Sequence, residues 1–153
     1  MNSHRSPSTG PGTNRPLRVL KFGGTSLGTA DRLTKAVGIV QDAASTCRPV
    51  LVVSAAAGIT DDLVRAAAET RSDRATAEAW TQHIGRRYRT LARAALDDEA
   101  LRTRYDSVLD VELSELRRAL QALTGSNAAA APDAVLATGE RAMVPLVVAA
   151  LDA

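Results

Sequence analysis

Hydrophobic and polar positions along the chain divide it into a strand-like beginning and a helical remainder. Two short apolar runs, LRVLKF at 17–22 and RPVLVVSA at 48–55, are rich in Val and Leu and indicate strands. Between them, residues 29–44 repeat apolar positions every three or four residues, which is typical of a helix. The order strand, helix, strand predicts a βαβ unit with parallel strands and a right-handed crossover.

The helix and the second strand of this unit carry two further expectations. Thr29 or Asp31 is expected to cap the start of the helix, because either side chain can accept backbone hydrogen bonds there. The core-facing positions that follow from helical spacing are Leu33, Ala36, Val37 and Val40. The second strand is a nearly continuous apolar run, which predicts that both of its faces are covered.

The chain from about residue 75 to 125 has the apolar spacing of helices. Core-facing positions are expected at Trp80, Ile84, Tyr88 and Leu91, and then at Val108, Val111, Leu113, Leu116 and Leu120. Pro132 suits the start of a last helix, in which Pro145 is a possible bend. Because two strands make a very small sheet, we expect an α/β fold with an incomplete sheet and a long helical insertion.

Composition and charge exclude several classes of function. The net charge of +2 arises near the N-terminus, where residues 1–18 hold Arg5, Arg15 and Arg18 and no acid. The remainder is slightly acidic, so no nucleic-acid surface is expected on the folded part. Aromatic residues make up 3%, which is too few for platforms that stack on bases. Residues 1–17 are rich in Pro, Gly, Ser and Thr and are expected to form a disordered leader.

Cysteine usage and hydropathy give the expected compartment. Cys47 is the single cysteine, so no internal disulfide is possible, and the sequence has no zinc-type spacing. The N-terminus lacks the apolar core of a secretory signal. No apolar run is expected to reach membrane-spanning length. These observations predict a cytoplasmic protein with no bound metal and no membrane partner.

The stretch VLKFGGTS at 19–26 is the first candidate for chemistry. Lys21, one of only two lysines, ends the first strand and is followed by Gly23, Gly24, Thr25 and Ser26. Glycines let backbone N–H groups approach an anion closely, and a lysine can neutralise a phosphoryl group. The spacing matches neither common glycine-rich nucleotide motif. A tight turn with a solvated lysine explains the stretch equally well.

Two more stretches carry candidate residues. Ser54 ends the second strand and Thr60 opens the helix after it, at the strand edge where open α/β sheets bind ligands. Glu140 stands among small and apolar residues, where a carboxylate needs a partner. The alternatives are a polar loop residue for Ser54, a helix cap for Thr60 and a surface position paired with Arg141 for Glu140.

Taken together, KFGGTS at 21–26, SAAAGIT at 54–60 and GER at 139–141 resemble the motifs of aspartate kinases, in the amino-acid kinase superfamily. Their order and spacing also fit, with the long helical insertion between the second and third motifs. The resemblance covers residues 18–153 and implies the N-terminal, amino-acid-binding lobe of the amino-acid kinase fold. Ala56 stands where that family commonly has serine or another small residue.

The resemblance implies phosphoryl transfer from ATP, with Mg²⁺, to the side-chain carboxylate of L-aspartate. The product would be 4-phospho-L-aspartate, the first step towards lysine, threonine and methionine. Lys21 would be catalytic, and it would contact phosphate together with Gly23, Gly24, Thr25 and Ser26. Ser54 and Thr60 would hold aspartate, and Glu140 would bind its α-ammonium group.

The kinase domain of this family continues beyond the third motif and contains most of the ATP pocket. The resemblance therefore implies a fragment that needs its C-terminal half, supplied by missing sequence or by a separately encoded chain. The expected protein partner is a second copy in a homo-oligomer or this complementing C-terminal half. The alternative is a non-catalytic remnant that binds aspartate or a partner protein.

Overall fold

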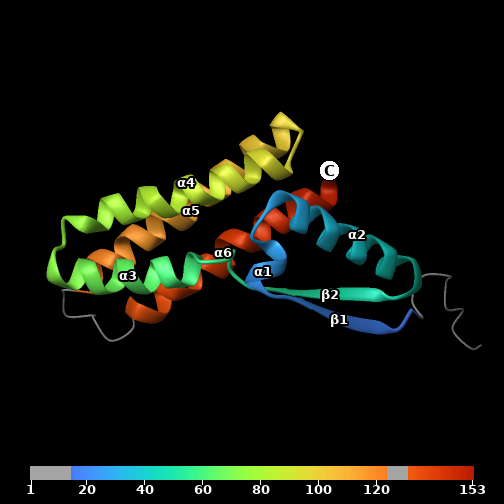
Figure 1. Cartoon of the computed structure of the whole chain (residues 1–153), viewed down its shortest axis with the longest axis horizontal. Helices are drawn as coiled ribbons and strands as arrows, with labels where there is room; N and C mark the ends of the chain where they lie inside the picture. The colour runs from blue at the N-terminus through green and yellow to red at the C-terminus, as the bar shows by residue number, and fades with distance from the viewer. Residues whose placement is uncertain (1–14, 124–130) are drawn as a thin grey trace, which may run out of the picture.

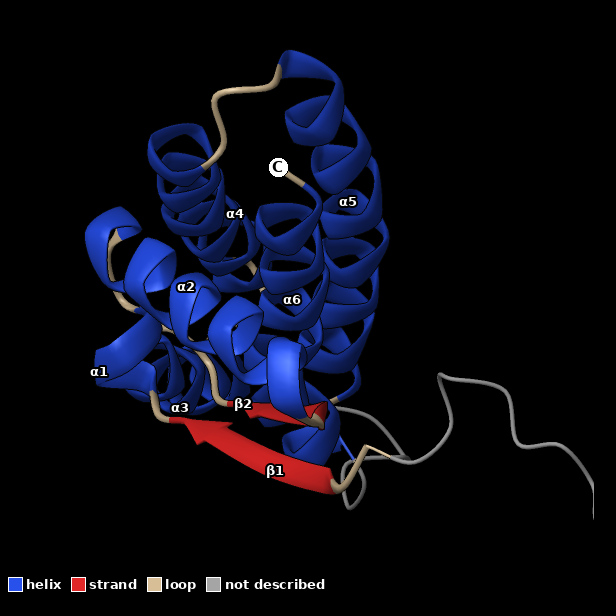
Figure 2. Cartoon of the chain, turned by 90° about the vertical axis from the view of Figure 1, so that its right-hand side faces the viewer, coloured by secondary structure: helices blue, strands red, loops and turns tan. Residues whose placement is uncertain are grey.

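The computed structural model describes residues 15–123 and 131–153 (Figure 1). Its elements in chain order are β1 (Leu17–Phe22), α1 (Gly24–Leu27), α2 (Ala30–Thr46), β2 (Arg48–Val53), α3 (Ile59–Ser72), α4 (Thr76–Ala95), α5 (Glu99–Ala122) and α6 (Ala131–Asp152). The expected leader lies mostly outside the described residues. Figure 2 shows both strands at one side of the molecule, with α2 and α6 on the same side of the sheet.

The predicted βαβ unit is confirmed. β1 and β2 pair in parallel, with Leu17 opposite Arg48 and Phe22 opposite Val53. The Thr29 hydroxyl accepts a hydrogen bond from the Arg32 N–H at 3.4 Å, so Thr29 is the cap of α2. All four expected core residues of α2 are buried, namely Leu33, Ala36, Val37 and Val40.

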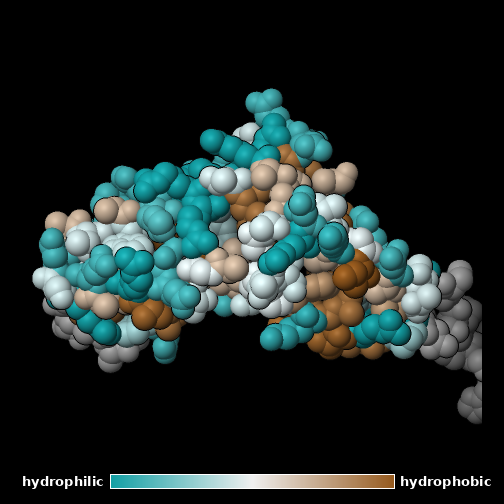
Figure 3. All heavy atoms as spheres, in the orientation of Figure 1, coloured by the Kyte–Doolittle hydropathy of each residue, from teal (hydrophilic) through white to brown (hydrophobic). Residues whose placement is uncertain are grey.

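The sheet is covered on one face only. Leu20, Leu51 and Val53 are partly buried and pack against the core. Helix α2 lies along one face of the sheet (Figure 1). The opposite face carries exposed apolar side chains with relative exposures between 43% and 62%, namely Leu17, Val19, Val50 and Val52. Figure 3 shows this apolar patch over the strands. The prediction that β2 is covered on both faces is therefore wrong for the described residues, because α2 packs on one side alone.

We expect the isolated chain to self-associate through this open sheet face, because contiguous apolar patches of this kind are uncommon on monomers. Val19→Glu places a charge in its centre and should shift the chain towards monomer in sedimentation velocity. Val64→Glu is the control, because Val64 is an exposed valine on α3. A purely monomeric unchanged chain across the concentration range would contradict this expectation.

The helical half packs α4 against α5, and α5 against α6. On α4, Ile84 and Tyr88 are buried, as the spacing predicts. On α5 the buried residues are Tyr105, Leu109, Leu113, Leu116 and Leu120. Val108 and Val111 were expected in the core but are exposed. Helix α5 has two adjacent apolar rows. The row of larger side chains, Tyr105 and the leucines, faces the neighbouring helices, and the row with Val108 and Val111 does not.

Helix α6 is the most apolar element and forms the centre of the core. It contacts α2, α3, α4 and α5, and it continues through Pro145. Pro132 occupies its second position, as expected for a helix start. Among the described residues, α6 is the one helix that is long and apolar enough to cross a membrane, judged by length and composition. The expectation that no apolar run reaches that length is therefore wrong. In this fold 44% of the apolar window of α6 is buried, and Val144 and Val148 remain exposed.

Candidate active site

Two turns lie side by side at the carboxyl ends of β1 and β2. The Ser54 N–H donates to the Phe22 carbonyl at 3.1 Å, which extends the pairing of the two strands into the turns. A Cβ atom placed on Gly24 would lie 2.7 Å from the Ala55 carbonyl oxygen. Only glycine allows this approach, so Gly24 brings the first turn into direct contact with the second.

Lys21 and the hydroxyl residues of the first turn face solvent. Lys21 lies on the open sheet face opposite Val52, and Thr25 and Ser26 are exposed on α1. Gly23 stands at the cap position of α1, where its carbonyl accepts from the Ser26 N–H at 2.9 Å. Among the described residues no carboxylate lies within 4.0 Å of the Lys21 ammonium. The ammonium group is therefore available to an anion.

Helix α6 brings Glu140 to the second turn. Gly139 permits the approach, because a Cβ there would lie 2.6 Å from the Ala55 Cβ. The half-buried Glu140 accepts a hydrogen bond at its Oε1 from the Ala55 N–H at 3.3 Å. Arg141 instead donates to Glu112 at 2.7 Å. The surface pair between Glu140 and Arg141 is therefore absent, and Glu140 lies beside Ser54.

Ser54 and Thr60 lie at the two ends of a segment that we call the β2–α3 loop (residues 54–60), which consists of the turn 54–58 and the first two residues of α3. Ser54 is half-buried beside β1, whereas Thr60 is exposed in the first turn of α3. The cap position of α3 is Gly58, not Thr60, and no side chain caps this helix. Gly58 has φ of 76°, a left-handed conformation that favours glycine.

Sequence reasoning missed two side chains that support the site, one at the β2–α3 loop and one at α6 next to Glu140. The Tyr88 hydroxyl donates to the Gly139 carbonyl at 2.6 Å, next to Glu140. The Arg87 guanidinium donates to the Ala57 carbonyl at 2.7 Å. The sequence places Tyr88 in the core. A buried tyrosine needs a polar partner for its hydroxyl, and this requirement could have indicated a contact near the site. Arg87 gave no signal, because nothing in its local sequence distinguishes it from the other arginines.

Both tyrosines of the chain are buried with their hydroxyls on carbonyls of α6. Burial raises the pKa of Tyr88 and of Tyr105 well above the usual value, and nearby Glu140 adds to the effect at Tyr88. Because the folded state holds these protons more tightly, their contribution to stability is complete below about pH 10, the unfolded pKa, and falls as pH rises. We expect phenolate absorbance in a pH titration to appear together with unfolding, followed by circular dichroism. Phenolate formation near pH 10 in the folded chain would contradict this.

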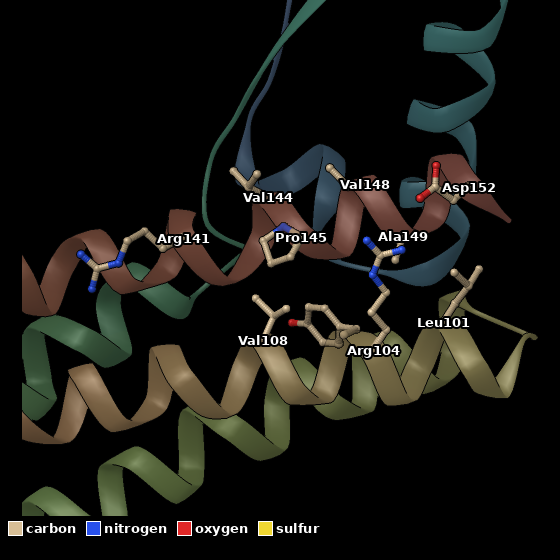
Figure 4. Close-up of a pocket in the computed structure, with 10 residues that line it drawn as sticks. Leu101, Arg104, Val108, Arg141, Val144, Pro145, Val148, Ala149 and Asp152 are labelled. Atoms are coloured by element: carbon tan, nitrogen blue, oxygen red, sulfur yellow. The ribbon is translucent and has the colours of Figure 1, made fainter.

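A groove between α5 and α6 is separate from the two turns. It has a volume of about 310 Å³ and is lined mainly by apolar side chains, including Val108, Val144, Pro145 and Val148 (Figure 4). None of the predicted ligand-binding residues lines it. Among the described residues no cluster of His, Cys, Asp and Glu side chains could hold a metal ion. The candidate site therefore consists of the two turns and Glu140.

Comparison with known proteins gives the family. The family model of the amino acid kinase family matches residues 16–153. The crystal structure of E. coli aspartokinase III in complex with lysine and aspartate, in the T state, is similar with a TM-score of 0.67 and 25% sequence identity. The match covers 90% of this chain and 29% of that chain. A comparison with curated protein sequences finds no match. With both turns and the fold in place, the chain belongs to the amino acid kinase family.

Proposed function

We propose that the chain is the N-terminal part of an aspartate kinase, which transfers a phosphoryl group from ATP to the side-chain carboxylate of L-aspartate. The observation that carries the proposal is the hydrogen bond from the Ala55 N–H to Glu140 at 3.3 Å. It joins two stretches 85 residues apart that both resemble aspartate kinase motifs. The similarity to aspartokinase III is consistent with this substrate.

The first turn would act on the phosphoryl group. Lys21 supplies a positive charge at the strand end, where it would stabilise negative charge in the transition state. Gly23 and Gly24 leave the backbone N–H groups of the turn accessible to phosphate oxygens, and Thr25 and Ser26 add hydroxyl donors. We assign no magnesium ligand to this chain, and Mg²⁺ would arrive bound to the phosphates of ATP.

The second turn and α6 would hold L-aspartate. Ser54 and Thr60 offer hydroxyl donors to its carboxylates, and Glu140 offers a carboxylate to its α-ammonium group. The reacting carboxylate has a pKa of about 3.9 and is ionised near neutral pH, so no general base is needed. Catalysis would rest on positioning and charge. We expect this chemistry in the cytoplasm.

The test is ATP-dependent formation of aspartyl hydroxamate, in which hydroxylamine traps the acyl phosphate. The chain is assayed with circular dichroism to confirm folding, with ATP omitted or L-glutamate replacing L-aspartate as controls. Hydroxamate that needs both substrates supports the proposal. Saturable L-aspartate binding in calorimetry without hydroxamate, even after a C-terminal kinase half is added, favours the second candidate, a non-catalytic aspartate-binding module. Absence of both activities from a folded chain would reject the proposed substrate.

One observation favours a role that depends on a partner: among the described residues the sheet is open on one face. The chain spans 29% of the aspartokinase III chain to which it is similar. A complementing C-terminal kinase half or a second copy of the chain would pack on that face. If the C-terminal half is the partner, adding it to the chain would restore hydroxamate formation. Hydroxamate formation after this addition would support the first proposal, that the chain is part of an aspartate kinase.

A further inference from the structure

Helix α4, which belongs to the long insertion, contacts the β2–α3 loop through the side chain of Arg87. Arg87 donates through Nη2 to the Ala57 carbonyl at 2.7 Å and through Nη1 to the Asp62 carboxylate at 2.5 Å. Ala57 lies in the middle of the loop, and Asp62 lies in the first turn of α3. One guanidinium therefore connects the loop backbone to the helix that follows it.

The loop has a backbone conformation that needs such support. Gly58 is the one residue with positive φ among the described residues, and it lies directly beneath the Arg87 guanidinium, since a Cβ on it would be 3.4 Å from Nη1. No side chain caps the first turn of α3. The hydrogen bond from Arg87 holds the Ala57 carbonyl directly before the left-handed Gly58, and so restrains the turn at this point.

Asp62 is held in its ionised form. Its side chain is 16% exposed, and it accepts from Arg87 and lies 3.0 Å from the His83 Nε2. Burial alone would raise the pKa of Asp62, but the hydrogen bonds and charges of His83 and Arg87 outweigh it and lower that pKa. A partly buried carboxylate with two partners restrains the Arg87 side chain.

We propose that Arg87 is a positioning residue that sets the geometry of the β2–α3 loop around L-aspartate. The inference rests on the proposed function for the identity of the ligand. Ser54 and Thr60 lie at opposite ends of this loop, and Glu140 contacts it at Ala55. Arg87 binds the loop at Ala57, between Ser54 and Thr60. Loss of the Arg87 side chain would therefore change the positions of Ser54, Thr60 and Glu140 relative to one another without removing any group that touches substrate.

The test compares Arg87→Gln and Arg87→Lys with the matched control Arg89→Gln. Arg89 is on the same helix and pairs with Asp110 and Asp106 of α5, away from the loop. Amide hydrogen exchange of residues 55–60 is measured in the unliganded chain. Loss of two charge-assisted hydrogen bonds should accelerate exchange there about tenfold or more in Arg87→Gln, with no loop effect in the control. Arg87→Lys should be intermediate, since an ammonium group retains the charge without the fork.

The second readout is affinity for L-aspartate, by calorimetry or as KM in the assembled kinase. We expect Arg87→Gln to weaken L-aspartate about tenfold while KM for ATP is unchanged, and Arg87→Lys to recover part of the loss. Unchanged loop exchange in Arg87→Gln would overturn the inference, as would faster exchange with unaltered L-aspartate affinity. If the unchanged chain binds no L-aspartate, the proposed function fails, and exchange alone decides whether Arg87 holds the loop.

Discussion

Replacing Lys21 with alanine is expected to slow phosphoryl transfer at least a hundredfold and to leave the chain folded. The side chain is exposed at the end of β1, so its removal costs little packing. In the proposed reaction its ammonium group opposes the charge that develops on the transferring phosphoryl group. Removing one such group costs about 10²–10³-fold in rate. The measurement is hydroxamate formation by the chain, or by its assembly with a kinase half, alongside thermal unfolding.

Arg93→Ala is the matched control for this experiment. Arg93 is exposed in the last turn of α4, so the variant removes the same charge from a different place. We expect nearly full activity from it. Retained activity in Lys21→Ala would remove the proposed role of Lys21. Equal losses in the two variants would assign the effect to overall charge and not to the position of Lys21.

Gly139→Ala is expected to destabilise the fold and to separate Glu140 from the β2–α3 loop. The added Cβ would lie 2.6 Å from the Ala55 Cβ and 3.3 Å from a methyl group of Ile59. Relief requires α6 or the loop to move, and overpacking of this kind costs about 1–3 kcal/mol. The midpoint of urea unfolding measures the cost, and calorimetry measures the accompanying loss of L-aspartate affinity.

Gly38→Ala is the matched control, because it makes the same change where there is room. Gly38 is inside α2, and a Cβ there would meet no atom within 4 Å. It should stabilise the chain by about 0.5–1 kcal/mol through the better helix propensity of alanine. A Gly139→Ala variant as stable as the unchanged chain would contradict the close packing of α6 on the loop.

The sequence was sufficient for the features that have local signatures. The βαβ unit follows from period and turn residues, and Thr29 caps α2 as its position suggests. Features decided by the rest of the fold were not accessible. Val108 and Val111 have helical spacing, yet the neighbouring row of α5 was buried. β2 is apolar throughout, yet only one of its faces is covered here.

In the candidate site too, the residues with local signatures could be predicted from the sequence and the contacts that depend on the rest of the fold could not. Motif residues at the strand ends could be found because their types and order are distinctive. The supporting contacts could not, since the hydrogen bonds from Arg87 to Ala57 and from Tyr88 to Gly139 span 30 and 51 residues. No local pattern specifies a partner at such separations. Gly58 was also missed as the cap position of α3, because its left-handed turn is fixed by this surrounding packing.

The contact between Ala55 and Glu140 has a consequence for the order of folding. Closing an 85-residue chain segment costs entropy, so this contact is expected to follow the contacts between elements that are closer in sequence. The packing of α4 on α5 and of α5 on α6, and the pairing of β1 with β2, involve shorter separations and can form earlier. We expect α6 and the loop to meet after these contacts have formed. Competence to bind ligand should therefore arise late in refolding, after most of the helical signal has returned.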